Sequence, residues 1–389
     1  MASHPDVECP APARLVHKTR LGHIYLGDSL ALFRDWIAEQ SVDLIMTSPP
    51  FGLVRKKDYG NVAADQYVEW FRPFARAFQR ALKPNGSLVI DIGGAWNPGH
   101  PTKSLYQYEL LICLCREFGF HLAQEFFWWN PARLPTPAEW VTVRRIRVKD
   151  AVNCIWWLSP SPWPKASNRR VLQPYSESMK ELLAKGYKPK LRPSGHDISD
   201  KFGTDNGAAI PPNLLAIAHT ESNSRYIRYC AENGLKPHPA RFPCELPEFF
   251  IRMLTDAHDL VVDPFAGSCV TGEAAEKCGR RWICCEVVYE YVRGAVGRFT
   301  PSTGVSYSSD SPAADEQEGT WYRVYKPGLK WNGVEDDPLP ADGGLKRPKR
   351  QPRDKPHGGQ TPRETEPVQM LLMETASAEV KKRKKPKKQ

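Results

Sequence analysis

The sequence predicts an α/β protein built on a doubly wound, mostly parallel, seven-stranded sheet with one inserted region. Three observations predict this fold class. Short apolar runs of strand type alternate with amphipathic, helix-type stretches along residues 21–300. Polar residues and small-residue turns directly follow several of these runs, as they do at the carboxyl ends of parallel strands. Between residues 160 and 237 the periodicity weakens while Pro, Lys, Arg, Asn and Tyr accumulate, which indicates the insertion.

Seven apolar runs define the expected strands. In chain order they are residues 24–26, 44–46, 88–91, 125–129, 153–158, 260–262 and 282–285. The expected helices are residues 29–38, 64–82, 105–118, 246–254 and 271–278. Because strands and helices alternate along the chain, the order favours parallel strands with helices on both faces of the sheet.

The loop Ser48-Pro49-Pro50-Phe51 directly follows the second apolar run. Its chemistry suits an exocyclic amino group of a nucleic-acid base, whose nitrogen lone pair is delocalised into the ring. The Ser48 hydroxyl and a backbone carbonyl held outward by the stiff Pro49-Pro50 pair can accept both amino hydrogens and favour a tetrahedral nitrogen. Phe51 is expected to stack on a base taken out of the duplex. A simple turn is the alternative interpretation.

A second loop, residues 263–268, joins the sixth apolar run to a helix. Gly267 supplies a permissive turn that lets the backbone approach a ligand. The next strand ends in Glu286, whose carboxylate can hold ribose hydroxyls, although a solvated strand end is the alternative. The loop resembles the Phe-x-Gly-x-Gly turn of S-adenosylmethionine enzymes, with Cys269 in place of the last glycine. This replacement reduces backbone freedom and puts cofactor affinity in question.

Motifs from about residue 22 to about residue 299 resemble the amino methyltransferases of restriction-modification systems, in the group whose catalytic motif precedes the cofactor motif. They are similar in particular to PvuII-type N4-cytosine methyltransferases. The motifs are residues 47–51, 55–57, 146–153, 192–198, 210–215 and 238–243. The resemblance implies a Rossmann-like, S-adenosylmethionine-dependent methyltransferase sheet. It also implies methyl transfer to the N4 atom of a flipped cytosine in duplex DNA, with CAGCTG as the site.

The resemblance assigns roles to individual residues. The expected catalytic residues are Ser48, Pro49, Pro50, Phe51 and Asp91, where Asp91 orients Ser48 or the cofactor. The expected cofactor contacts are Asp28, His238, Pro239, Arg241, Phe242, Asp263, Pro264, Phe265, Ala266, Gly267, Ser268 and Glu286. For Asp28 and Asp91, a helix cap or turn role is the alternative. The expected DNA contacts are Arg55, Lys56, Lys57, Arg192 and His196, with solvated surface as the alternative.

The motifs divide the chain into five segments. Residues 1–20 are an N-terminal extension, and residues 21–159 are the catalytic part of the methyltransferase domain. Residues 160–237 are the target-recognition region, and residues 238–300 are the cofactor-binding part. Residues 301–389 are expected to be a disordered basic tail, because aliphatic residues become rare there. The basic end of the tail suits nonspecific phosphate contact, or nuclear import in a eukaryotic host, with a solvated tail as the alternative.

Composition agrees with a polyanionic partner. The chain carries a net charge of +10 with a pI of about 9.0. Its ten cysteines include no CxxC pair, so neither disulfides nor a metal is expected. No stretch approaches the ~18 apolar residues of a membrane span, which predicts a soluble, cytoplasmic protein. The expected partners are double-stranded DNA and a cognate restriction endonuclease that forms no stable complex, and a monomer or weak dimer is expected.

Three alternatives to N4-cytosine methylation stay open. N6-adenine transfer uses nearly the same loop, and methylation of RNA or of a protein glutamine is chemically reachable. A catalytically inactive DNA-binding protein is an alternative of another class, which Cys269 alone suggests. Covalent attack by Cys244 on carbon five of cytosine is disfavoured, because the Glu-Asn and Pro-Cys pairs stand in the wrong order and before the cofactor loop.

Overall fold

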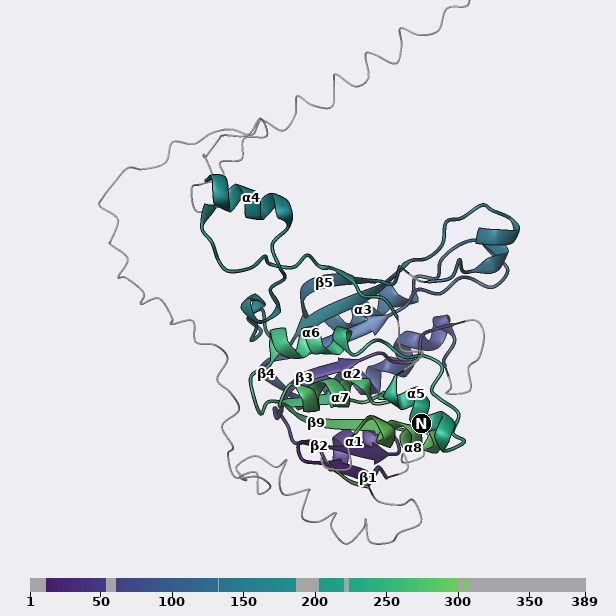
Figure 1. Ribbon diagram of the computed structural model, residues 1–389. Coiled ribbons are helices and arrows are strands. Elements are labelled where there is room, and N and C mark those ends of the chain that lie inside the picture. The colour runs from purple at the N-terminus through teal and green to yellow at the C-terminus, as the bar shows by residue number, and fades with distance from the viewer. Residues whose placement is uncertain are drawn as a thin grey trace, which may run out of the picture. The chain divides into compact units, whose positions relative to one another are not determined.

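A computed structural model describes residues 12–53, 61–131, 133–186, 203–219, 224–299 and 304–306. A single ten-stranded sheet forms its centre (Figure 1), in the order β10-β1-β2-β9-β8-β3-β4-β6-β5-β7. The strands are β1 (Arg14–Thr19), β2 (Gly22–Leu26), β3 (Val42–Thr47), β4 (Leu82–Ile92), β5 (His121–Trp129), β6 (Val152–Ser159), β7 (Leu214–Ala216), β8 (Leu260–Asp263), β9 (Arg281–Glu286) and β10 (Gly304–Ser306).

All seven predicted strands are present and lie side by side as β2-β9-β8-β3-β4-β6-β5. The predicted strand number is nevertheless wrong, because β1, β7 and β10 extend the sheet at its two edges. β1 falls in the predicted N-terminal extension, where His17 and Thr19 take buried positions and hide the apolar alternation. β7 and β10 each have three residues, too few to produce a periodic pattern.

The centre of the sheet is parallel, as predicted. β2, β9, β8, β3 and β4 are joined by parallel pairings, so their carboxyl ends meet at one edge. β6 lies between β4 and β5 and runs antiparallel to both. The first residues of β6 therefore lie at the same edge as the last residues of β4.

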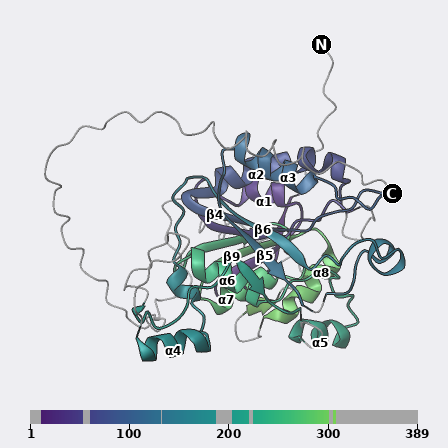
Figure 2. The same cartoon turned by 90° about the horizontal axis from the view of Figure 1, so that it is seen from above.

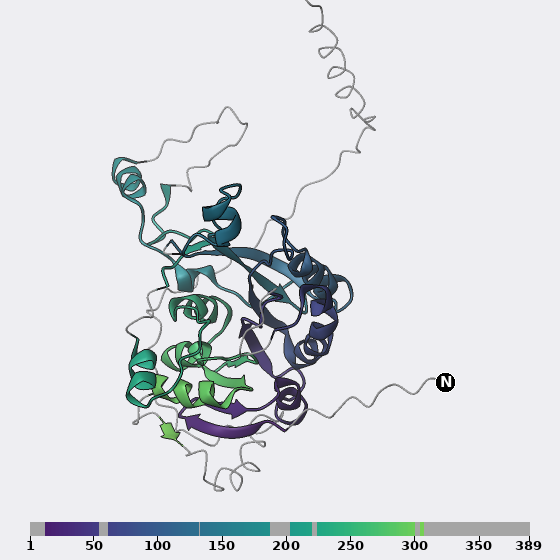
Figure 3. The ribbon, with the colours of Figure 1, turned by 90° about the vertical axis from the view of Figure 1, so that its right-hand side faces the viewer.

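Helices cover both faces of the sheet (Figures 2 and 3). Helices α1 (Ser29–Asp35), α2 (Tyr67–Ala81) and α3 (Tyr106–Arg116) share a core with one face. Helices α6 (Glu245–Leu254) and α7 (Val270–Lys277), with α8 (Tyr289–Ala295), share a second core with the other. Neighbouring strand residues alternate between the two cores, as Ile45 and Met46 do. This arrangement is the predicted doubly wound architecture.

Two further helices belong to the predicted recognition region. They are α4 (Glu177–Lys185) and α5 (Arg225–Glu232). α4 lies apart from the sheet and has no buried residue (Figure 1). α5 packs beside α8 through Tyr226 and Cys230, which are both buried.

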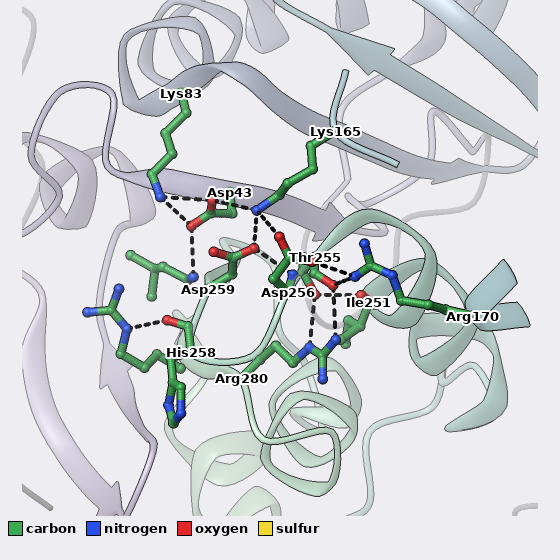
Figure 4. Close-up of polar contacts among 12 residues, drawn as sticks. Asp43, Lys83, Lys165, Arg170, Ile251, Thr255, Asp256, His258, Asp259 and Arg280 are labelled. Carbon is green, nitrogen blue, oxygen red and sulfur yellow. Dashed lines mark hydrogen bonds and ion pairs between the residues drawn. The ribbon is translucent and has the colours of Figure 1, made fainter. Parts of the chain in front are cut away.

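The start of the predicted recognition region is bonded to the amino ends of β3 and β8 (Figure 4). Lys165 Nζ lies 3.3 Å from an oxygen of the buried Asp43 and also pairs with Asp259. Arg170 Nη1 lies 2.9 Å from Asp256 Oδ1. The backbone of Ser167 donates to Met253 O at 2.8 Å. The first residues of the predicted recognition region are therefore packed against the amino ends of these two strands.

Candidate active site

A pocket of about 510 Å³ opens at the carboxyl ends of the central parallel strands. It is lined by all five predicted catalytic residues, Ser48, Pro49, Pro50, Phe51 and Asp91. It is also lined by most predicted cofactor contacts, namely Asp28, His238, Arg241, Phe242, Pro264, Phe265, Ala266, Gly267, Ser268 and Glu286. Two loops more than 200 residues apart in sequence thus share one cavity, because β3 and β8 are parallel neighbours.

Ser48 and Asp91 form a hydrogen-bonded pair in the pocket. Ser48 Oγ donates to Asp91 Oδ2 at 3.1 Å. Asp91 is 2% exposed, and its burial raises the pKa to about 6, although Ser48, Asn153 and Arg133 each favour the charged form. A hydroxyl has one hydrogen and two lone pairs. Because Asp91 takes the hydrogen, Ser48 keeps only lone pairs for a ligand, which is the arrangement that an amine donor requires.

Arg133 and Asn153 extend this pair, and the sequence did not reveal them. Arg133 Nη1 donates to Asn153 Oδ1 at 2.9 Å, and both residues line the pocket. Asn153 is the second residue of β6, which reaches the site because that strand is antiparallel to β4. Its place in the motif of residues 146–153 was the only available signal, since strand spacing alone predicts nothing about the start of a strand.

The Phe51 ring is positioned by the backbone of Gly93. A Cβ atom on Gly93 would lie 2.5 Å from Phe51 Cε2 and 2.7 Å from its Cδ2. Only a glycine permits this approach, so the ring and the end of β4 fit together as one surface. Gly93 is a further positioning residue that sequence reasoning missed.

Asp263 lies beneath the second loop and does not line the pocket. It is 1% exposed and accepts from Thr47 Oγ1 at 2.8 Å, from Thr271 Oγ1 at 2.6 Å and from Phe265 N at 3.1 Å. Its burial raises its pKa to about 6. Asp263 therefore joins the end of β3 to the β8–α7 turn. Pro239 also lies outside the lining residues.

Glu286 holds the second loop from the end of β9. Its Oε2 atom accepts from Gly267 N at 2.8 Å, and its Oε1 atom accepts from Val287 N and Val288 N at 3.0 and 2.9 Å. Burial raises the pKa of this carboxyl, which is 8% exposed and lines the pocket. Gly267 has a φ of +52°, and a Cβ atom there would lie 3.1 Å from the His238 ring. The turn, the carboxylate and the imidazole thus pack as one unit.

Asp28 caps a helix, which is the alternative role considered for it, and it also lies where a cofactor contact was predicted. Its Oδ1 atom accepts from Leu30 N at 2.7 Å, which caps α1. It also lines the pocket at the end of β2.

His238 is neutral near pH 7, because burial lowers its pKa to about 4. Its backbone N–H donates to Tyr226 Oη at 2.7 Å, so α5 helps to hold the segment of residues 238–243. The guanidinium of Arg241 lies 5.7 Å from the centre of the Tyr226 ring and donates to His238 O.

Cys269 adopts the backbone conformation that its sequence position suggested. It is buried, precedes α7 and has a φ of 60°, in the left-handed region that favours glycine. A side chain in this region costs about 1 kcal/mol. The turn therefore keeps its shape with a cysteine, at some cost in stability.

Cys244 lies outside the lining residues of the pocket. Burial raises the pKa of its thiol to about 12, so it is not a thiolate near neutral pH. This agrees with a structural role for Cys244 and disfavours covalent attack on a base.

The predicted DNA contacts Arg55, Lys56, Lys57, Arg192 and His196 lie outside the residues that the structure describes. In the described ranges, no cluster of His, Cys, Asp and Glu side chains could hold a metal ion. Nor does any helix in the described part of the chain have the length and apolar character needed to cross a membrane.

Comparison with known proteins agrees with this geometry. Residues 42–297 match the N6_N4_Mtase family, described as DNA methylase. The chain is 52% identical over 286 residues to the type II methyltransferase M.PvuII of Proteus hauseri, covering 73% of this chain and 85% of that protein. It is 24% identical over 313 residues to the DNA adenine methyltransferase YhdJ of Escherichia coli (strain K12), covering 78% and 91%.

Among solved structures, the PvuII DNA methyltransferase (cytosine-N4-specific) matches with a TM-score of 0.61 and 42% identity. The match covers 80% of this chain and 95% of that one. The chain belongs to the N6_N4_Mtase family of DNA methylases.

Proposed function

We propose that this protein transfers a methyl group from S-adenosylmethionine to the exocyclic N4 atom of a cytosine taken out of duplex DNA. The observation that carries the proposal is the Ser48–Asp91 pair, which shares one pocket with the β8–α7 loop and Glu286. Similarity to M.PvuII supports cytosine as the base and a restriction-modification system as the setting.

The pocket residues fit a nucleoside cofactor. Glu286 and Asp28 supply carboxylates at the ends of neighbouring strands, and Phe265, Phe242 and Pro264 supply apolar surface. S-adenosylmethionine supplies an electrophilic methyl group on a sulfonium. The protein's part is then to position the amine and to remove a proton from it.

Ser48 and the Pro49 carbonyl orient the attacking nitrogen by accepting its two hydrogens. The bond from nitrogen to the methyl carbon forms as the bond from sulfur to that carbon breaks. The nitrogen then loses one proton, which passes through the Ser48 hydroxyl to the Asp91 carboxylate. A pKa of about 6 suits this acceptor, because the group is mostly ionised at neutral pH and yet binds a proton readily.

The substrate specificity is the finer part of the proposal. We assign the site CAGCTG, with its inner cytosine modified, from the similarity to the PvuII enzyme. Base recognition would come from the region of residues 160–237, and the phosphate contacts would include the segment of residues 55–57. We further propose that the protein acts as a monomer or weak dimer in the cytoplasm. A cognate endonuclease would bind the same site without forming a stable complex with it.

Expression in a host that lacks DNA methylation, followed by base-resolved sequencing of modified DNA, tests the proposal. We expect N4-methylcytosine at the inner cytosine of CAGCTG, and none in cells that make Ser48→Ala. Modified adenine at N6 would instead support the adenine alternative. An unmodified genome, despite folded protein that binds S-adenosylmethionine in calorimetry, would contradict the proposal.

A further inference from the structure

The connection between β5 and β6 forms a basic arm. The arm consists of residues 130–151. The arm projects from the sheet and includes a short helical turn, η2 (Glu139–Val143) (Figures 1 and 3). No described side chain between residues 131 and 151 is buried. Its charged residues are Arg133, Arg144, Arg145, Arg147, Lys149, Glu139 and Asp150.

The two acidic side chains of the arm are already paired. Glu139 Oε1 accepts from Arg144 Nε at 2.7 Å. Asp150 pairs with Lys103, outside the arm, and accepts from Trp96 Nε1 at 3.0 Å. The arm therefore keeps an excess of positive charge.

Besides Arg133, which lines the pocket, three basic side chains of the arm carry this excess, namely Arg145, Arg147 and Lys149. Arg147 Nε donates to Pro101 O at 3.1 Å, and Lys149 Nζ donates to Arg133 O at 3.2 Å. In the described part of the chain, no carboxylate forms an ion pair with Arg145, Arg147 or Lys149. Their charges are thus available to an anionic partner.

Arg145 occupies a strained backbone position. Its φ is 55°, in the left-handed region, where a non-glycine residue costs about 1 kcal/mol. The turn around it is closed by Arg144 N donating to Glu139 O and Ile146 N donating to Trp140 O, both at 2.9 Å. An exposed arginine held where a glycine would fit with less strain suggests that its side chain has a task.

The arm begins at the pocket. Asn130 and Arg133 line the cavity, and Arg133 is bonded to Asn153 beside Asp91. When a base enters such a pocket, the phosphates on either side of it stay at the mouth. The duplex that flanks the target base therefore passes the root of the arm.

We propose that the arm is a second DNA-contacting element, in which Arg145, Arg147 and Lys149 bind phosphates of the duplex flanking the target base. The inference rests on the proposed function and adds a contact outside the region of residues 160–237. Phosphate contacts fix the position and orientation of the protein on the duplex but carry no sequence information. The arm is therefore expected to strengthen binding to longer duplexes without changing which sequence is recognised. The arm also exposes the apolar residues Leu134, Val143 and Val148, so the alternative to DNA binding is that the arm contacts a second copy of the chain.

The test pairs a double variant with a control of equal charge. Arg145→Gln with Lys149→Gln removes two charges from the arm. Arg20→Gln with Arg116→Gln removes two exposed charges far from the arm in the fold: Arg20 lies between β1 and β2, and Arg116 is the last residue of α3, so both lie toward the amino ends of the parallel strands. Arg145→Lys with Lys149→Arg keeps the charge of the arm. Binding to a duplex that contains CAGCTG is measured against salt concentration, with long flanks and with flanks trimmed close to the site.

With long flanks, the arm variant is expected to bind about tenfold more weakly and to lose about two from the slope of log affinity against log salt. Its KM for DNA rises while kcat at saturating DNA stays unchanged. Trimming the flanks weakens the wild type but not the arm variant. The control pair and the charge-keeping pair behave as the wild type does.

Two results would overturn the inference. If the arm variant matches the control pair in affinity and salt slope while the wild type binds and methylates DNA, the arm does not contact DNA and the proposed function stands. A changed sedimentation coefficient with unchanged DNA binding would assign the arm to self-association instead. A wild type that neither binds nor methylates duplex DNA removes the proposed function itself.

Discussion

Two buried aspartates on neighbouring strands, Asp43 of β3 and Asp91 of β4, have pKa values shifted in opposite directions. Each is 2% exposed. Asp43 accepts from Lys83 Nζ at 2.8 Å, from Lys165 Nζ at 3.3 Å and from Leu260 N at 3.1 Å. Burial would raise its pKa, but these partners hold the pKa below its ordinary value. Asp91 lacks such an ion pair, and burial raises its pKa to about 6.

The two aspartates lie at opposite ends of the parallel strands: Asp43 is near the amino end of β3, and Asp91 is near the carboxyl end of β4. The contrast shows how the two ends of the sheet differ. At the amino edge the buried charge is compensated, and it fastens residues 160–171 to β3 and β8 (Figure 4). At the carboxyl edge, Asp91 and Asp263 have only neutral hydrogen-bond donors at close range and have raised pKa values. These two carboxyls therefore lower the stability of the folded state near neutral pH, at the ends of the strands where we propose that a proton is transferred.

Removing the compensated aspartate should have the largest effect on stability. Asp43→Ala leaves Lys83 and the Leu260 N–H without this acceptor and removes one of the carboxylates that surround Lys165, so we expect a loss of about 4 kcal/mol in the free energy of unfolding. Denaturant unfolding at pH 7 measures it. Methyl transfer per folded molecule should be unchanged, and a lowered kcat would break the assignment of separate tasks to the two edges.

Asp43→Asn is the matched control, because it keeps an acceptor for Leu260 N and loses only the charge. We expect a loss of about half that of Asp43→Ala. Since the pKa of Asp43 is lowered in the folded state, its stabilisation is present above about pH 4 and is lost as the pH falls further. The difference between wild type and Asp43→Asn should therefore shrink in acid.

The opposite sign is expected for Asp91→Asn. Raising a pKa from 3.8 to about 6 makes the folded protein bind its proton more tightly than the unfolded chain does. The wild type therefore loses stability as the pH rises from about 4 to about 6, and stays less stable above that. Asp91→Asn should gain about 3 kcal/mol at pH 8 and almost nothing at pH 4, while methyl transfer falls. Thermal unfolding at both pH values measures it, and equal gains would contradict the account.

The smallest effect is expected at Cys269. Elsewhere alanine usually stabilises a protein relative to glycine, but here the backbone is left-handed. Cys269→Gly should therefore be more stable than Cys269→Ala by about 1 kcal/mol, since both remove the thiol and only one relieves the strain. Denaturant midpoints of the two variants give the difference. An alanine variant at least as stable as the glycine variant would refute the strain.

Much of the fold and of the site was predictable, because the carboxyl ends of parallel strands lie on the same side of the sheet and so bring together the residues that follow them. Ser48 and Gly267 could be placed in this way from two apolar runs. Arg133 and Asn153 could not, because Arg133 lies in the loop before β6, Asn153 is the second residue of that strand, and periodicity does not show that β6 runs antiparallel to β4. Asp263 followed the same rule as Ser48 but turned inward to Thr47 and Thr271, which only the packing decides.

The single-turnover rate of methyl transfer against pH, at saturating DNA and S-adenosylmethionine, tests the central claim most directly. If Asp91 must be ionised to receive the proton, the wild-type rate should be about tenfold lower at pH 5 than at pH 8, with its midpoint near pH 6. The slow residual rate of Asp91→Asn should show no such rise. A flat wild-type profile, or the same rise in the variant, would contradict the account.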